Sequence, residues 1–582
     1  MRPDRLLPLL CGILALSSVA VAQSSPSATA APPTFKTGAT NVLVDVVVAG
    51  HHGRPVEGLS QDNFTVLENG KTQRIVSFSF HPSATPLPAA ALPRLPGGVY
   101  TNAEAVANND TVDVLLLDAL NTPPSGQVQT HRVMLEYLKS LPVDKPIAIF
   151  TLDTQLHQIE GFTTDHTVLL KAVDEFSRSP QKSPLLKTPQ DTARQLKDED
   201  DALELGLAAQ NLGTGEMMMH QLQQFNAEQD SFSLNLRVQY TLSAFDQLGR
   251  YLSGLPGRKN VMWLSGSFPV AVMPNPDLKD PTQAARDFSG AVNHTAGLLA
   301  NARVAVYPID ARGIFPQPLS LPAIAAGDSI ARTPDRVDAS ESADSSLHAE
   351  ERLTLEQVAH ATGGEAIYNT NDLKGALAEV DRTGTHYYTL TYVPSDKSQD
   401  NKLRRIEVRV HPGNYRLSYR RSYTPALAPA HDNSFQALMQ HNVPASTQIL
   451  FRLSPLRGAV QPATAQLAGS NPNVPRPVTR YSIAYDVDVS PLVLSSSADG
   501  VLHGQATLVS IAYDRDGKPL NSVANTLSLN VPSAEYARFL KEGIHYREQL
   551  DMPAQAAWLR AGIYDHVSGQ VGSLEVPLGR TK

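Results

Sequence analysis

Asp118, Asn121 and Thr122 carry the oxygen and amide groups of this sequence that are best placed for chemistry. They follow a short apolar run, Val114 to Leu117, and precede two prolines and a helical pattern. A continuous apolar run of this length is typical of a strand buried on both faces, as in parallel sheets. Ligands of open α/β sheets bind at the carboxyl ends of such strands. The pattern therefore predicts a ligand-binding crevice at these three residues.

Other oxygen-bearing residues follow neighbouring expected strands. Asp153 follows the strand 146–152, and Asp310 ends the strand 304–309. Ser265 and Ser267 come after the strand 260–264 and are further ligand-binding candidates. Because Mg²⁺ retains several waters and needs few carboxylates, Asp118, Thr122, Asp153 and Asp310 could hold Mg²⁺ or another divalent cation. The alternative is that Asp118 caps the next helix and the other two aspartates are ordinary loop residues.

Strands must alternate with helices to bring these residues to one edge. From residue 111 to 393 the apolar periodicity switches repeatedly between strand and helix, which predicts a doubly wound, mostly parallel sheet. A polar insertion at 177–215 and a loop at 312–349 interrupt it. After the insertion, Met217 to Met219 with Leu222 and Phe225 predict the buried face of a long helix; the alternative is an adaptable binding stripe.

Two β-rich segments flank the α/β pattern. Strands are expected within 35–80, where Asn69-Gly70 marks a hairpin, and within 394–424. Because two or three strands alone are marginal, we expect these segments to pair into one β-sandwich with the α/β domain inserted. The pattern from 447 to 582 predicts a separate β-sandwich. The remaining segments are a lead-in at 23–34 and linkers at 81–110 and 425–446.

The first 22 residues predict a secretory signal peptide. Arg2 and Arg5 precede an apolar stretch, and Ala20-Val-Ala22 is a small-residue cleavage site. The sole cysteine, Cys11, would be lost on cleavage, which excludes disulfides and thiolate zinc sites in the mature chain. No other stretch has transmembrane length. We expect an exported protein in the periplasm, on the outer-membrane surface or outside the cell. The net charge of −8 gives no electrostatic case for nucleic-acid binding.

Several short motifs together resemble the von Willebrand factor type A domain, in the form found in bacterial proteins of the acidobacterial type. They are Val56 to Leu59, Asp62 to Gly70, Val114 to Thr122, Gly257 to Leu264, Val306 to Arg312, Ala361 to Gly364 and Tyr388 to Tyr392. The resemblance implies a Rossmann-like α/β domain, and type A domains often carry a metal-ion-dependent adhesion site.

The adhesion-site motif is degenerate in this chain. Asp118 matches the aspartate of the motif D-x-S-x-S and Thr122 can replace its last serine, but Leu120 stands at the middle serine. Leu264-Ser265-Gly266 stands where T-D-G is expected. What the resemblance implies is a binding module with at most a reduced set of cation ligands.

We expect a non-enzymatic binding module that recognises a protein or cell-envelope polymer at the Asp118 crevice. On that view, replacing Asp118 by Ala leaves folding largely intact and reduces ligand binding. One alternative is a structural or assembly protein of the envelope with an inert crevice. A hydrolase using Asp118, Asp153 or Asp310 is a third, less favoured, because the sequence contains no recognised catalytic constellation and no G-x-S-x-G motif.

Overall fold

The computed structural model describes most of the chain beyond residue 40. The described residues are 41–50, 53–82, 95–104, 111–141, 145–177, 183–186, 189–208, 212–266, 268, 271–272, 280, 282, 285–311, 352–398, 402–425, 432–462, 464–496 and 500–579. The expected signal peptide, the lead-in, the loop at 312–349 and Ser267 lie outside them.

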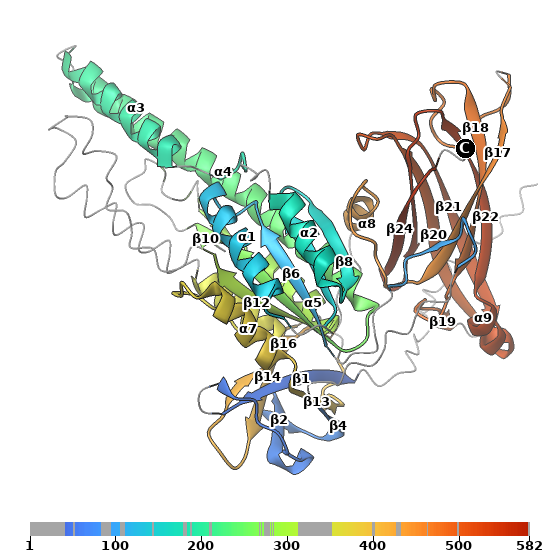
Figure 1. Cartoon of the computed structure of the whole chain (residues 1–582), viewed down its shortest axis with the longest axis horizontal. Coiled ribbons are helices and arrows are strands. Elements are labelled where there is room, and N and C mark those ends of the chain that lie inside the picture. The colour runs from blue at the N-terminus through green and yellow to red at the C-terminus, as the bar shows by residue number, and fades with distance from the viewer. Residues whose placement is uncertain are drawn as a thin grey trace, which may run out of the picture.

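A five-stranded mixed sheet forms the centre of the α/β unit (Figure 1). Its strand order is β12-β9-β6-β7-β8, and β12, β9, β6 and β7 are mutually parallel. Only β8 runs antiparallel, at one edge. The bounds are β6 (Thr111–Asp118), β7 (Ile147–Leu152), β8 (Leu156–Thr163), β9 (Arg258–Ser265) and β12 (Val304–Asp310).

Helices cover both faces of this sheet, which explains its apolar strands. Val114 and Leu116 of β6 share a core with residues of α4 (Leu212–Ser253), α5 (Ser289–Asn301) and the helical segment 352–362. Leu115 and Leu117 face a second core, formed with α1 (Pro124–Leu138), α2 (His166–Ser177) and α7 (Leu373–Gly384). These four side chains are at most 4% exposed, as a strand covered on both sides requires.

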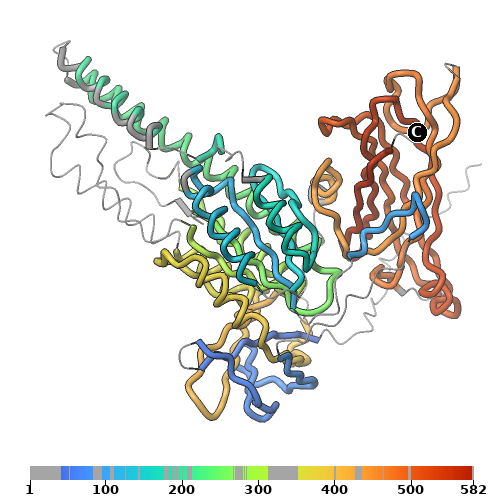
Figure 2. Tube along the Cα trace, viewed as in Figure 1, coloured from blue at the N-terminus to red at the C-terminus, as the bar shows by residue number. Residues whose placement is uncertain are grey.

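A helical hairpin projects from the α/β unit (Figures 1 and 2). Its first helix, α3 (Pro189–Ala208), lies within the expected insertion, and its second is the N-terminal part of α4. Glu199 of α3 accepts hydrogen bonds from the side chains of Gln223 and Asn226 on α4. The C-terminal part of α4 packs on the sheet, so one helix serves both the hairpin and the core.

The β-rich unit consists of two four-stranded sheets built from both flanks of the α/β unit. Their orders are β15-β1-β13-β4 and β16-β14-β2-β3. The pairing of β1 with β15 and of β2 with β14 joins segments that are more than 300 residues apart in the sequence. The bounds are β1 (Val42–Ala49), β2 (Phe64–Glu68), β3 (Lys71–Gln73), β4 (Ile75–His81), β13 (Tyr387–Tyr392), β14 (Arg404–Val410), β15 (Arg416–Ser418) and β16 (Ser422–Tyr423).

Strand β13 corrects one prediction. We expected it to belong to the α/β domain, but it pairs antiparallel with β1 and β4 in the β-rich unit. Tyr388, Leu390 and Tyr392 are buried in that unit's core. At its first residue, Tyr387 lies opposite His81, the last residue of β4, and the two rings stack 4.5 Å apart. The chain therefore leaves and re-enters this sheet at adjacent positions.

The C-terminal unit has two sheets around one core. Their orders are β22-β18-β17-β5 and β19-β20-β23-β24, and β21 pairs with β20. The bounds are β5 (Tyr100–Thr101), β17 (Phe451–Val460), β18 (Val478–Val487), β19 (Ser495–Ser496), β20 (Val501–Tyr513), β21 (Pro519–Pro532), β22 (Ile544–Pro553), β23 (Trp558–Asp565) and β24 (Val571–Pro577).

Both expected linkers contain ordered elements that attach to the C-terminal unit. Strand β5, within 81–110, pairs with Arg452 and Leu453 of β17. Helix α8 (Asp432–Leu438), within 425–446, packs on the outer face of the second sheet.

The last described helix, α9 (Tyr536–Glu542), follows β21. Among the described helices, none combines the length and the apolar character needed to cross a membrane.

Candidate functional site

Asp118 lies at the carboxyl end of β6 and is 2% exposed. Its Oδ1 accepts a hydrogen bond from the backbone N–H of Asn121 (2.9 Å). Its Oδ2 accepts three more: from Nδ2 of Asn121 (2.8 Å), Nε1 of Trp263 (3.0 Å) and Oγ of Ser265 (2.8 Å). The carboxylate thus joins the loop after β6 to the neighbouring strand β9.

Asn121 extends this network to α4. Its Nδ2 also donates to Oγ1 of Thr241 (2.9 Å), and its Oδ1 accepts from Nε of Arg237 (2.9 Å). Asn121 and Thr241 are 0% exposed, and Arg237 is buried. These two α4 residues and Trp263 could not be predicted as partners, because each lies more than 100 residues away from its partner along the chain.

Thr122 is buried and connects the loop after β6 to the end of β9 and to α1. Its Oγ1 accepts a hydrogen bond from the backbone N–H of Gly266 (2.9 Å), directly after β9. Its carbonyl oxygen accepts from Nε2 of Gln127 in α1 (2.9 Å). A Cβ at Gly266 would come within 2.8 Å of the Asn121 carbonyl oxygen, so this close approach of two loops requires glycine.

These residues do not fit a hydrated divalent cation in the described arrangement. The two oxygens of Asp118 already accept four hydrogen bonds, and Thr122 Oγ1 accepts one. The cavity beside them, between Leu117, Asp118 and α1, holds only about 10 Å³, close to the minimum for a single water. Mg²⁺ would need room for itself and its coordinated waters.

Of the other predicted ligands, Ser265 joins Asp118, whereas Asp153 does not. Asp153 lies in the β7–β8 turn with its side chain 38% exposed, where it accepts from the N–H of Gln155 and contacts His157. Asp310 is buried at the end of β12, in register with Ser265. Within the described ranges, no three His, Cys, Asp or Glu side chains gather as a metal site would require.

Burial sets the electrostatics of the Asp118 network. Loss of hydration raises the pKa of Asp118, and the hydrogen bonds from Asn121, Ser265 and Trp263 partly offset that rise. The carboxylate is therefore held by neutral donors and has no cationic group bonded to it. Its chemistry is that of a structural junction between loop, strand and helix.

A second candidate surface lies on the projecting hairpin. Met218, Phe225 and Phe232 of α4, which we term the α4 stripe, are 45%, 63% and 60% exposed. This corrects the prediction that Met217 to Met219 and Phe225 form a buried face, because Met217 is also 56% exposed. The periodicity predicts a helix and the segment is helical, but this part of the helix extends beyond the sheet that its C-terminal part covers.

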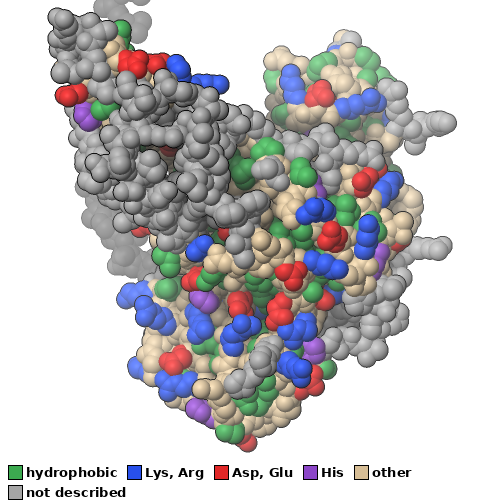
Figure 3. Space-filling model, turned by 60° about the vertical axis from the view of Figure 1, so that its left-hand side comes forward, with side chains coloured by type: hydrophobic (Ala, Val, Ile, Leu, Met, Phe, Trp, Pro, Cys, Tyr) green, Lys and Arg blue, Asp and Glu red, His purple; other side chains and the backbone are tan. Residues whose placement is uncertain are grey.

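Charged side chains of one sign do not gather into a patch on the face drawn in Figure 3. Lys and Arg are interspersed with Asp and Glu over its lower half. This part of the face therefore carries no basic patch of the kind that binds nucleic acids.

No family model matches this chain, and neither does any curated protein. Solved structures show slight similarity. BatB from Bacteroides thetaiotaomicron, described as a conserved hypothetical protein, is 9% identical, with a TM-score of 0.22 over 48% of this chain and 99% of that one. An aerotolerance-related membrane protein from Bacteroides fragilis is 11% identical, with a TM-score of 0.24 over 47% and 98%. The pilus adhesin SpaC from Lactobacillus rhamnosus GG is 7% identical, with a TM-score of 0.24 over 92% and 58%. Similarity of this degree carries no argument on function.

Proposed function

We propose that this chain is an exported, non-enzymatic binding protein that contacts a protein partner through the α4 stripe. Its α/β unit is a type A-like domain, as the sequence motifs suggest, with a mixed sheet covered by helices on both faces. The observation that carries the proposal is the exposure of three large apolar side chains at regular spacing on one projecting helix.

The spacing places the three side chains on one face. Met218, Phe225 and Phe232 are seven residues apart, which is close to two helical turns. Gln223 and Asn226, which bond to α3, lie on a different side of the helix, and Gln224 accepts a hydrogen bond from the N–H of Asp280. The stripe therefore occupies a face that these contacts do not use, and apolar side chains exposed in a row are typical of protein interaction sites.

The Asp118 crevice offers less to a ligand. Asp118, Asn121 and Ser265 are at most 2% exposed, and their polar atoms are bonded to one another and to α4. A ligand would have to displace these internal hydrogen bonds, which costs about 1 to 3 kcal/mol for each buried group left without a partner. This supports an architectural role for Asp118 and recognition elsewhere on the α/β unit.

Site-specific photocrosslinking tests the proposal. A photoreactive phenylalanine analogue at position 225 or 232 should give a discrete adduct with one envelope protein in intact cells. Position 154, in the β7–β8 turn beside Asp153, reports on the carboxyl end of the sheet. Position 128, an equally exposed apolar site on α1 (Val128, 57% exposed), is the matched control.

The pattern of adducts decides between the surfaces. Adducts at 225 and 232 that disappear when the other two stripe residues are changed to Ser support the proposal. Adducts at 154 alone would move recognition to the crevice and refute the stripe. Adducts of the same kind at all positions, including 128, would show only non-specific contact and would also refute it.

A further inference from the structure

Among the strands that the structure describes, β21 of the C-terminal unit has one long edge that pairs with no other strand. It has 14 residues, pairs with β20 along one side, and contains no charged residue between Pro519 and Pro532. We propose that two copies of this chain pair edge to edge along β21, through residues 524–532, in an antiparallel arrangement with Ser528 on the two-fold axis. This inference does not depend on the proposed function of the α4 stripe.

The register identifies which backbone groups are free. Ser522 lies opposite Ile511, and its carbonyl oxygen accepts a hydrogen bond from Ser470, outside the β20–β21 pair. Because successive residues of a strand alternate in direction, Ala524, Thr526, Ser528 and Asn530 also turn their N–H and C=O groups away from β20. Among the described residues, no strand pairs with this side of β21.

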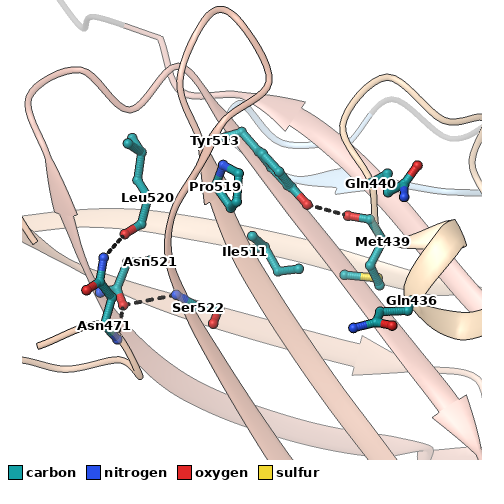
Figure 4. Close-up of a pocket in the computed structure, with 10 residues that line it drawn as sticks. All are labelled: Gln436, Met439, Gln440, Asn471, Ile511, Tyr513, Pro519, Leu520, Asn521 and Ser522. Atoms are coloured by element: carbon teal, nitrogen blue, oxygen red, sulfur yellow. Dashed lines mark hydrogen bonds between the residues drawn. The ribbon is translucent and has the colours of Figure 1, made fainter. Parts of the chain in front are cut away.

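The chain itself covers the beginning of the same edge. Asn471 donates to the carbonyl oxygen of Leu520 (2.7 Å), and its N–H donates to Oδ1 of Asn521 (3.1 Å) (Figure 4). Ser470 bonds to Ser522 through both backbone and hydroxyl groups. This cover ends at Ser522. The adjoining pocket of about 410 Å³ lies at this covered end and is lined by uncharged residues of β20, β21, the segment 436–440 and Asn471.

Other long edges of the same unit are protected in ways that β21 is not. Strand β24 is covered by residues 446–449, whose backbone bonds to Val571 and Ser573. Strand β22, at the edge of the other sheet, carries His545, Arg547, Glu548 and Asp551. Charges and covering segments are the usual means by which proteins prevent edge pairing. Strand β21 has prolines only at its two ends.

A second copy fits the free edge better than a charged partner strand. Self-pairing about a two-fold axis places no like charges opposite each other, because the strand has none. With Ser528 on the axis, Thr526 faces Asn530 of the other copy and Leu527 faces its Leu529, so polar residues meet polar ones and apolar meet apolar. The arrangement forms about six backbone hydrogen bonds.

The same register avoids the covered end. Pro532 of one copy then lies opposite Ala524 of the other, which is two residues beyond the covered Ser522. The partner strand ends there, because a 3₁₀ turn begins at Ser533. Ser470 can therefore keep its hydrogen bond to Ser522 while the dimer forms.

Light scattering coupled to size-exclusion chromatography tests the proposal on the chain from residue 23 onward. The wild type should show twice the mass of one chain and dissociate on dilution. Ser528→Lys should be monomeric, because two ammonium groups would face each other at the axis. Ser528→Glu should also be monomeric, because two carboxylates would face each other there. Mixing the two variants should restore a dimer. Leu456→Lys, at a 58% exposed position on strand β17 of the other sheet, is the control and should remain dimeric.

Ser528→Pro provides a second route. It removes the outward N–H without removing a bond to β20, so it should abolish the dimer while leaving the circular dichroism spectrum and melting temperature close to wild type. A wild type that is monomeric at every concentration overturns the proposal. So does a dimer that survives both Ser528→Lys and Ser528→Pro, because neither charge nor loss of the donor would then affect it.

Discussion

Arg237 donates a hydrogen bond of 2.9 Å from Nε to the amide oxygen of Asn121, across 116 residues of sequence. The same Asn121 side chain donates a hydrogen bond from Nδ2 to Asp118. The guanidinium of Arg237 therefore orients the Asn121 amide that holds the Asp118 carboxylate at the end of β6. The order of these contacts fixes which way the Asn121 amide points. The loop that we expected to receive a ligand is instead hydrogen-bonded to α4, the longest of the described helices.

Removal of the Asp118 side chain should destabilise the protein, contrary to the expectation drawn from the sequence. Asp118→Ala leaves four hydrogen-bond donors, on Asn121, Trp263 and Ser265, without their acceptor. We expect a loss of about 3 kcal/mol in the free energy of unfolding, measured by urea denaturation. Asp153→Ala, at a 38% exposed turn position, should cost less than about 1 kcal/mol. Equal effects of the two substitutions would contradict the structural role of Asp118.

Divalent cations should not stabilise the folded chain. A ligand that binds only the native state raises its stability by about 2.7 kcal/mol at a hundredfold excess over the dissociation constant. Because the cavity beside Asp118 measures about 10 Å³, we expect MgCl₂ and EDTA to leave the melting temperature unchanged to within about 1 °C, relative to NaCl of equal ionic strength. A melting temperature that rises steadily with the logarithm of the Mg²⁺ concentration would show that a site forms.

Lys259 should make stability depend on pH. It is 2% exposed, and its Nζ donates to the carbonyl oxygen of Ala302 (2.9 Å). Burial, together with the positive charge of Arg303, lowers the pKa of Lys259 to about 7, from 10.5. The unfolded chain therefore binds more protons at this site between those two values, so stability rises with pH across that window.

The substitution Lys259→Met removes this dependence. We expect the variant to gain most over the wild type at or below pH 7 and to lose that advantage towards pH 10. Urea denaturation of both proteins at several pH values measures the difference. A constant difference from pH 6 to pH 10 would mean that the lysine keeps an ordinary pKa in the folded protein.

Arg560 should hold α8 to the C-terminal unit. It is 1% exposed, and its guanidinium donates to the carbonyl oxygens of Leu438, Val443 and Pro444. Burial lowers its pKa to about 10. Arg560→Met should cost about 3 kcal/mol and expose residues 432–446 to limited proteolysis, with cleavage sites identified by intact mass. Arg457→Met, at an exposed position of β17, should leave the proteolysis pattern unchanged.

Individual strands and helices could be predicted from the sequence better than the pairing between distant strands. The apolar run of β6 required a strand covered on both faces, and its four central residues are buried accordingly. By contrast, β13 has the length and composition of a strand in either unit, and only its pairing with β1 and β4 decides its place. Pairing between distant segments leaves no periodic signal in a single sequence.

The same distinction applies to the candidate site. Asp118 and Ser265 end the adjacent parallel strands β6 and β9, and Asn121 follows β6, so their meeting could be expected from the topology. Arg237 and Thr241 of α4 make these three residues part of an internal network rather than an open site. The helical periodicity of α4 does not indicate that these two polar side chains point towards the sheet. For Met218 and Phe225, helical periodicity alone does not reveal where the covering sheet ends.

The stacking of His81 on Tyr387 has a consequence for how this protein could have arisen. Residues 82–386 begin and end at one antiparallel pair, so a short turn between β4 and β13 would convert them into an ordinary hairpin. The whole α/β unit can thus be regarded as an enlarged hairpin loop on a small all-β host. A different domain could replace the α/β unit at this position without altering the strand order of the β-rich unit.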